Sequence, residues 1–405
     1  MNLKQQIALN PRLLFWGRAL VETKTLSAVI VLFYLHRGLG LDEVFYLSIV
    51  WSLTSLVTEV PSGYLTDHIG RKRTLLLGVL LLIVSQVLTF FSYGFYPFVL
   101  SFVFMSASFS CFSGTEEALL YESLVETGKE DEMNRRNGKQ LSARSLPDIF
   151  LPAIGAFIAS GLLESQFQLL IALNIVASVF AFFLLSRLTE PRRNQYVAER
   201  ELGVFAQSIQ TIRNDPWLLK VALNKLLVFI ASFILWRMSQ PFLVQHGFGV
   251  EALGAFYVLF QGLQFGVGWF AGQIERLVGT ARIIALSAWM TIIGVVVAII
   301  TTHPLVAFAS LAIAISADAL REPLFAHAVN NRIHSRSRAT TLSNLNMMKG
   351  ILDIPILLLA GWLSNGSLNH PLLLAVALCI IAVIVFPIRS RELQGQNNPT
   401  AATAS

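Results

Sequence analysis

Charged side chains recur at a spacing of four residues inside long apolar stretches of this 405-residue sequence. On an isolated helix a base placed one turn before an acid is the less favourable order, so helix stability alone explains the pattern poorly. Long basic side chains can extend toward a membrane surface, which leaves the carboxylate at greater depth, where it could carry a proton. Three pairs share this order: Arg18 and Glu22, Arg144 and Asp148, Lys349 and Asp353.

We take Glu22 and Asp353 as the candidate proton carriers, and a static structural ion pair is the alternative for each of them. Lys24 lies about 200° around a helix from Glu22, so we expect it to meet a different partner on a neighbouring segment. Glu116 and Glu117 are about 100° apart and can border one cavity. A charge at the centre of a bilayer costs roughly 2.5–3.5 kcal/mol, so such groups should face water or one another. The remaining candidates for a proton or substrate site are Lys225, Asp318 and Arg321.

The composition indicates the elements that must position these charges. Only 13% of the residues are charged and 55% are hydrophobic, whereas soluble domains carry about 25% charged residues. Apolar runs of about 18 residues and more predict helical spans, because a helix satisfies its own backbone hydrogen bonds in lipid. We therefore predict an all-α membrane protein with twelve transmembrane helices, near 12–35, 44–66, 74–94, 97–123, 142–163, 168–188, 217–243, 252–274, 282–302, 305–330, 340–364 and 371–388.

The distribution of lysine and arginine predicts the orientation of these spans. With both termini in the cytoplasm, 21 of the 30 basic residues fall in inside loops and tails, and one, Arg37, falls outside. Basic residues concentrate on the cytoplasmic side of membrane proteins. We expect a multi-pass protein of the inner (plasma) membrane, and the net charge of +6 gives no argument for binding nucleic acid.

Glycines repeat at a fixed offset of 209 residues. Gly38, Gly40, Gly63 and Gly70 correspond to Gly247, Gly249, Gly272 and Gly279, so the second half repeats the first. Two pseudo-symmetric six-helix halves form a transporter architecture, with substrate held near the midplane between them. The predicted organisation is an N-terminal half at 1–188, a cytoplasmic linker with an amphipathic helix at 189–216, a C-terminal half at 217–390, and a disordered cytoplasmic tail at 391–405.

The hairpin between the second and third spans carries the pattern G-x-L-x-D-x-x-G-R-K, which resembles the signature of the major facilitator superfamily. With the twelve spans, the central loop and the duplication, the resemblance covers essentially the whole chain. It implies a gate in which Asp67 meets the N-terminal end of span eleven. It also implies that Arg71 bridges to an acid at the end of span four, for which Glu122 is the best-placed match. The gating residues are thus Gly63, Asp67, Gly70, Arg71, Lys72 and Glu122.

One family pattern is mostly absent from this chain. The antiporter motif of span five would fall on residues 147–156, where only Pro152 and Gly155 match it. That departure weakens a drug-antiporter assignment, and the gating signature carries no information about the substrate.

The resemblance implies a secondary active transporter that moves a small organic solute by alternating access, and not an enzyme. We expect proton-coupled efflux, because acids are available and aromatic residues that could line a cavity are plentiful. The aromatic candidates are Phe102, Phe104, Trp236, Phe260, Phe265 and Trp269.

Three alternatives stay open at this stage. The first is proton-linked uptake of an organic anion or sugar, with the charges of Lys24, Arg144, Lys225, Arg321 and Lys349 available to bind it. The others are transport of a lipid-like amphiphile and a membrane sensor that does not transport. Besides solute, protons and the lipid bilayer we expect no cofactor and no metal, since the seven histidines lack metal-ligand spacing. A monomer is the default of the family.

Overall fold

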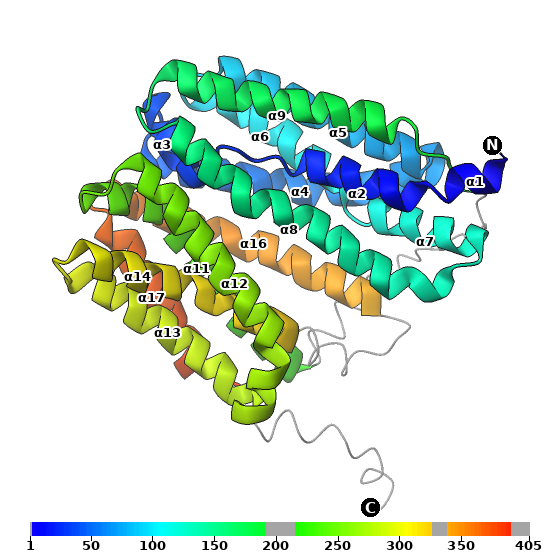
Figure 1. The fold of residues 1–405 in the computed structure, drawn as a ribbon. Coiled ribbons are helices and arrows are strands. Elements are labelled where there is room, and N and C mark those ends of the chain that lie inside the picture. The colour runs from blue at the N-terminus through cyan, green and yellow to red at the C-terminus, as the bar shows by residue number, and fades with distance from the viewer. Residues whose placement is uncertain (1, 192–214, 326–337, 390–405) are drawn as a thin grey trace, which may run out of the picture. The chain divides into compact units, whose positions relative to one another are not determined.

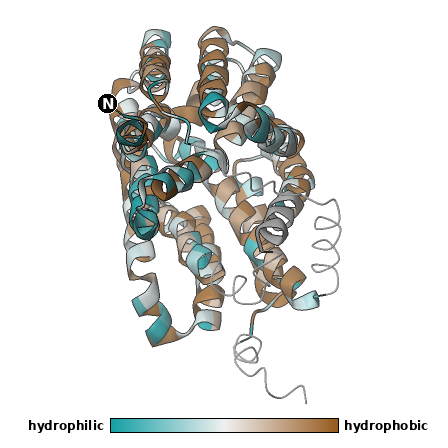
Figure 2. Cartoon of the chain, turned by 90° about the vertical axis from the view of Figure 1, so that its right-hand side faces the viewer, coloured by the Kyte–Doolittle hydropathy of each residue, from teal (hydrophilic) through white to brown (hydrophobic). Residues whose placement is uncertain are grey.

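The structure, a computed structural model, describes residues 2–191, 215–325 and 338–389. Within these ranges every regular element is a helix, and hydrophobic residues cover most of the length of the helices (Figure 2). Most of the predicted amphipathic linker and all of the predicted tail lie outside the described residues. The helices group into two compact units, Met1–Ala198 with Gly249–Tyr257, and Glu199–Phe248 with Val258–Ser405.

The first unit, which we call unit 1, contains the N-terminal helices (Figure 1). Helices α5, α6 and α4 pack together, and α9 packs against both α5 and α2. The elements are α1 (Leu3–Ile7), α2 (Asn10–Val21), η1 (Ser27–Val29), α3 (Ile30–His36), α4 (Leu41–Ile69), α5 (Arg71–Phe91), α6 (Phe95–Phe112), α7 (Thr115–Thr127), η2 (Glu130–Glu132), α8 (Met133–Ile158) and α9 (Glu164–Leu185).

The second unit, unit 2, is built around α11, α13, α14 and α17, which pack on one another. The 29-residue helix α12 begins among residues that belong to unit 1 and continues into unit 2. The elements are α11 (Pro216–Gln245), α12 (Val250–Val278), α13 (Thr280–Ile300), α14 (Pro304–Ser316), η3 (Ala317–Leu320), α16 (Arg338–Ser364) and α17 (Asn369–Ile384).

Within the described residues, each of the twelve predicted spans overlaps helical segments. Nine stretches of the described chain, from Leu41–Glu59 to Pro304–Phe325, are long and apolar enough to cross a membrane. They correspond to predicted spans two to ten. Shorter apolar helices at Ser27–His36 and Asn369–Ile384 correspond to spans one and twelve, and α16 corresponds to span eleven.

Two predicted spans are not the continuous helices that the apolar pattern predicted. The first, 12–35, is interrupted because residues 22–26 are not helical, so α2 is separated from η1 and α3. The fourth, 97–123, is interrupted at Ser113 and Gly114, where Gly114 has a φ of 73°. Hydropathy measures only apolarity, so it does not detect such breaks.

The internal repeat is visible in the helix boundaries. Helices α4 and α12, and likewise α5 and α13, begin and end at residues 209 positions apart. Gly70 lies between α4 and α5, Gly279 lies at the corresponding place between α12 and α13, and their φ values are 102° and 89°. Only glycine adopts such a conformation readily, so the turn geometry repeats along with the sequence.

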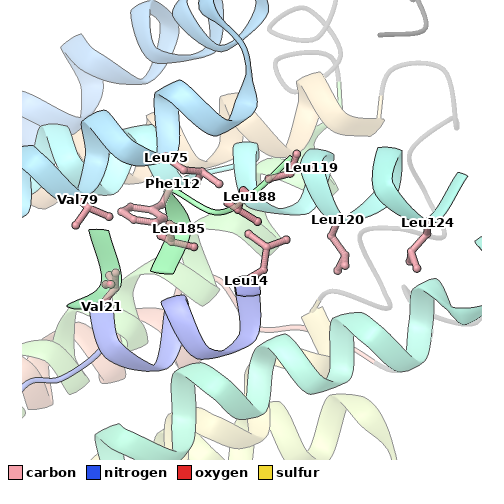
Figure 3. Close-up of a cluster of buried hydrophobic side chains, with 11 residues drawn as sticks. Leu14, Val21, Leu75, Val79, Phe112, Leu119, Leu120, Leu124, Leu185 and Leu188 are labelled. Atoms are coloured by element: carbon pink, nitrogen blue, oxygen red, sulfur yellow. The ribbon is translucent and has the colours of Figure 1, made fainter. Parts of the chain in front are cut away.

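A cluster of buried apolar side chains packs together inside unit 1 (Figure 3). Because lipid is as apolar as these side chains, close packing rather than removal from water favours their association. The cluster connects α2, α5, α6, α7 and α9 through Leu14, Val21, Leu75, Val79, Phe112, Leu119, Leu120, Leu124, Ala181, Leu185 and Leu188.

Candidate functional site

The hairpin between α4 and α5 holds the gating residues close together. The guanidinium of Arg71 lies 3.1 Å from Asp67 and 3.0 Å from Glu122 of α7. The contact with Glu122 that the resemblance implied is therefore present. The Asp67 side chain is 61% exposed. The proposed role of this group as a gate stays a prediction.

Sequence reasoning missed Glu190, the acid that completes this hairpin. Its carboxylate accepts hydrogen bonds from the backbone N–H groups of Arg71 (2.7 Å) and Lys72 (2.9 Å). It thus satisfies free donors in the first turn of α5, where a negative charge is favoured by the helix dipole. A Cβ at Gly70 would lie 2.9 Å from the Glu190 Oε1, so the glycine also makes room for the cap. Glu190 lies 119 residues from Arg71, and no local pattern pairs them.

A chain of alternating charges lies inside unit 1. Glu22 contacts both Lys24 and Arg18 at 2.5 Å. Arg18 reaches Glu116 at 3.7 Å, and Glu116 contacts Arg144 at 3.0 Å. The order is therefore base, acid, base, acid, base, and it brings α2, α7 and α8 together. We call these five side chains the charge relay.

The pairing of Lys24 with Glu22 corrects the prediction that Lys24 would find a different partner. That prediction assumed a continuous helix, in which the two side chains point to opposite sides. Helix α2 ends at Val21, and the chain then leaves the helical path, so the ammonium can turn back to the carboxylate. The break itself is held by neighbouring helices, because Thr25 Oγ1 donates to the Leu170 carbonyl oxygen at 3.1 Å.

Two further residues stabilise the unwound stretch from outside it. The side-chain oxygen of Asn174 in α9 accepts from the Thr25 backbone N–H at 3.3 Å and lies 3.0 Å from its hydroxyl. On the other side, Gly155 of α8 packs so tightly on the Thr25 carbonyl that a Cβ at this position would overlap the oxygen. Gly155, one of the two residues retained from the antiporter pattern, therefore serves close packing of α8 on the break.

The other candidate acids of unit 1 are placed differently from one another. Glu116 is buried in the charge relay, whereas Glu117 is exposed, so the two do not share the single environment that their spacing allowed. Asp148 accepts a hydrogen bond from the Tyr257 hydroxyl at 3.1 Å. Tyr257 lies on the part of α12 that belongs to unit 1.

In unit 2 the most buried candidate is Arg321. Its Nη1 donates to the Ile284 carbonyl oxygen at 2.6 Å and to the Ser287 hydroxyl at 3.0 Å. Its Nη2 donates to the Asn224 carbonyl oxygen at 3.2 Å and to the Asn224 side-chain oxygen. The side chain is 1% exposed. Arg321 thus joins α11 and α13 in the helix packing, and its expected place in a substrate site stays a prediction.

The remaining candidate charges of unit 2 differ in exposure, and Asp353 is buried. Lys225 contacts Glu322 at 2.8 Å, and both side chains are substantially exposed. Lys349 lies 3.4 Å from Asp353, as the four-residue spacing predicted, and 4.3 Å from the centre of the Phe229 ring. Asp318 is 3.8 Å from Arg321. In the described residues no group of three or more histidine, cysteine, aspartate or glutamate side chains is arranged to hold a metal ion.

Comparison with known proteins decides the family. The sequence model of a family described as the Major Facilitator Superfamily matches residues 19–354. The chain belongs to this superfamily. A curated relative, the uncharacterised MFS-type transporter YxaM of Bacillus subtilis (strain 168), is 23% identical over 249 residues, which are 58% of this chain and 58% of that relative.

Solved structures of the superfamily share the fold. A variant of the nucleoside transporter NupG superposes with a TM-score of 0.77 at 12% identity, covering 95% of this chain and 99% of the other. A D-xylose-proton symporter superposes with a TM-score of 0.67 at 13% identity, covering 97% and 98%. The superfamily fold, an all-α membrane architecture of two six-helix halves, is therefore the fold of this chain.

Proposed function

We propose that this superfamily member is a proton-coupled secondary transporter of a small organic solute that works by alternating access. Membership of a transporter family supports transport, and the buried carboxyl groups support coupling to protons. We further propose efflux as the direction, the inner (plasma) membrane as the location, cytoplasmic termini and a monomer. Exposed aromatic side chains such as Phe265 and Trp269 favour an organic solute, whereas Phe102 and Phe260 are buried and are not available to one.

One observation carries the coupling proposal. Among the described residues, Glu116 Oε1 and Asp353 Oδ1 are buried carboxyl oxygens without a hydrogen-bond partner. A buried acceptor without a donor is costly, and a proton bound there would remove the charge. Both oxygens of Glu22, by contrast, contact a base. We therefore prefer Glu116 and Asp353 over Glu22 as the proton carriers.

Proton movement in proteoliposomes tests this proposal. Purified protein would be reconstituted with an internal pH dye, and uridine, D-xylose, dialanine, benzoate and ethidium would be added in turn. We expect solute-dependent proton movement that is lost in Glu116→Gln or Asp353→Asn. The matched control is Glu117→Gln, because this neighbouring acid is exposed and lies outside the charge relay.

Four outcomes would contradict parts of the proposal. Labelled solute that crosses the membrane without proton movement would remove the coupling, and full coupling in both variants would remove these two carriers. Solute binding without flux would instead favour the sensor alternative. Uptake of an organic anion would reverse the proposed direction without affecting the coupling.

A further inference from the structure

The two ends of the charge relay are both bases, and they are its most exposed members. The side chains of Lys24 and Arg144 are 54% and 35% exposed, whereas those of Glu22 and Glu116 are 10% and 3% exposed. Arg18, in the middle, is 5% exposed. We infer that unit 1 contains a binding site for an organic anion, contacted by Lys24 and Arg144. This inference rests on the proposed transport function and names the substrate class.

The sign of the accessible charge follows from this order. A solute that approaches the relay meets an ammonium or a guanidinium first, and each acid lies behind the bases that it already contacts. A half-exposed ammonium facing hydrocarbon would cost several kcal/mol, so Lys24 faces water or a polar neighbour. A cationic solute would be repelled by both ends, and a neutral solute would gain hydrogen bonds from them but not the attraction between opposite charges.

Both bases keep donors for a ligand. Arg144 donates to Glu116 through Nη2 and its Nε is buried, but the side chain as a whole is 35% exposed. A guanidinium carries five N–H donors, so the exposed part of Arg144 can bind the carboxylate or phosphate of a ligand while Nη2 keeps its bond to Glu116. The ammonium of Lys24 carries three donors, so a ligand can share it with Glu22.

A general tendency of long bases to reach outward does not account for this order. In unit 2 the pair of Lys225 and Glu322 shows the opposite arrangement, with the acid 68% and the base 39% exposed. The pair of Lys349 and Asp353 shows the same order as unit 1, at 40% and 9%. The exposure of bases is therefore specific to certain pairs, and in unit 1 it occurs at both ends of one connected chain.

Charged thiol reagents test the site without knowledge of the natural substrate. The background carries Cys111→Ser and Cys379→Ser, which remove the two buried native thiols. Reporter thiols are introduced as Thr23→Cys beside Lys24 and Ser145→Cys beside Arg144, with Ser160→Cys as an exposed control beyond the end of α8. The probes are the sulfonatoethyl and the trimethylammonioethyl methanethiosulfonates, each normalised to its rate with free 2-mercaptoethanol.

At low salt we expect the normalised labelling rate of the anionic probe to be about five times that of the cationic probe at both reporters. This ratio is the effect of one unit charge about 8 Å away in water on two probes of opposite charge. Lys24→Gln should return the ratio at the Thr23→Cys reporter to about one, and Lys24→Arg should preserve it. Arg144→Gln should act in the same way at the Ser145→Cys reporter. Glu22→Gln should raise the preference, because it removes the acid behind Lys24. The control should show no preference for the anion.

Binding is distinguished from attraction by the dependence on concentration. A site that holds the sulfonate before reaction gives a labelling rate that saturates, whereas the rate with the ammonium probe stays linear. The inference would be overturned by equal normalised rates or by a preference for the cationic probe. It would also be overturned by labelling rates that stay linear with both probes, or by no reaction at either reporter.

The result is independent of the transport assay. A saturable anion preference in a protein that moves no solute would support the site and contradict the proposed transport function. Transport of neutral solutes alone, with no anion preference at either reporter, would support the proposed transport function and contradict the anion site.

Discussion

Replacing Arg321 distinguishes a packing role from a ligand role in unit 2. The guanidinium donates four hydrogen bonds to Ile284, Ser287 and Asn224, and Asn224 in turn donates to the Ala382 carbonyl oxygen at 2.8 Å. Glutamine is too short to reach this set of acceptors. The substitution Arg321→Gln therefore leaves buried acceptors without donors between α11 and α13.

The expected loss in the free energy of unfolding is about 3–5 kcal/mol. Hydrogen bonds to a charged group contribute about 1.5–3 kcal/mol each, and disrupting a buried charged group costs about 3–5 kcal/mol in total. For a unit of this size that loss corresponds to a fall of roughly 10 °C in the midpoint of thermal unfolding. The control Lys225→Gln removes an exposed base and should cost less than about 1 kcal/mol.

Thermal unfolding of the detergent-purified variants, followed by fluorescence and by recovery in size-exclusion chromatography, would measure the difference. Two results together would refute the packing argument. The first is a midpoint of thermal unfolding for Arg321→Gln within about 2 °C of the parent protein, which is the limit expected of a substitution at an exposed residue. The second is a loss of solute flux in the same variant. Arg321 would then contact the solute, as the sequence alone suggested.

Three other substitutions give expected outcomes on the same assay. Arg37→Gln should lower the free energy of unfolding by about 3–5 kcal/mol. The buried Arg37 loses its hydrogen bonds to the Glu164 carboxylate and to the backbone carbonyl oxygens of Phe90 and Ser92. An unchanged midpoint of thermal unfolding would contradict this. Gly155→Ala should lower the free energy of unfolding by about 1–3 kcal/mol, because the added methyl group overpacks against Thr25. The control Gly138→Ala lies on the same helix with open space around it, and it should leave the free energy of unfolding unchanged or raise it. Glu190→Ala should cost about 1 kcal/mol through loss of the cap on α5; equal stability would show that water replaces the carboxylate.

The sequence predicted the fold class and span positions because these depend on composition and on length. Few charges and long apolar runs are properties of a segment by itself, so α4, α5 and α13 were found from the chain alone. The repeat was found in the same way, because Gly70 and Gly279 keep their spacing from the neighbouring helices.

The site was predicted less completely, because its details depend on contacts between distant segments. Nothing in the residues Glu22 to Leu26 forbids a helix, and the break is held by Asn174 and Gly155, which are far away in the chain. The pairs within one helix turn were accessible to sequence reasoning, and the contacts of Arg18 and Glu22 and of Lys349 and Asp353 were predicted. The link from Arg144 to Glu116 was not, because it joins two helices.

The charge relay of unit 1 has a consequence for how this sequence can change over generations. Each acid in it serves two bases, Glu22 those of Arg18 and Lys24, and Glu116 those of Arg18 and Arg144. When one base is lost, each buried acid keeps a second one, so the effects of substituting the two bases of the same acid are not additive. Loss of one base is therefore expected to be tolerated, whereas loss of both bases of one acid leaves an uncompensated buried charge. A descendant that lacks the charge of Lys24 should keep that of Arg18 wherever it keeps Glu22.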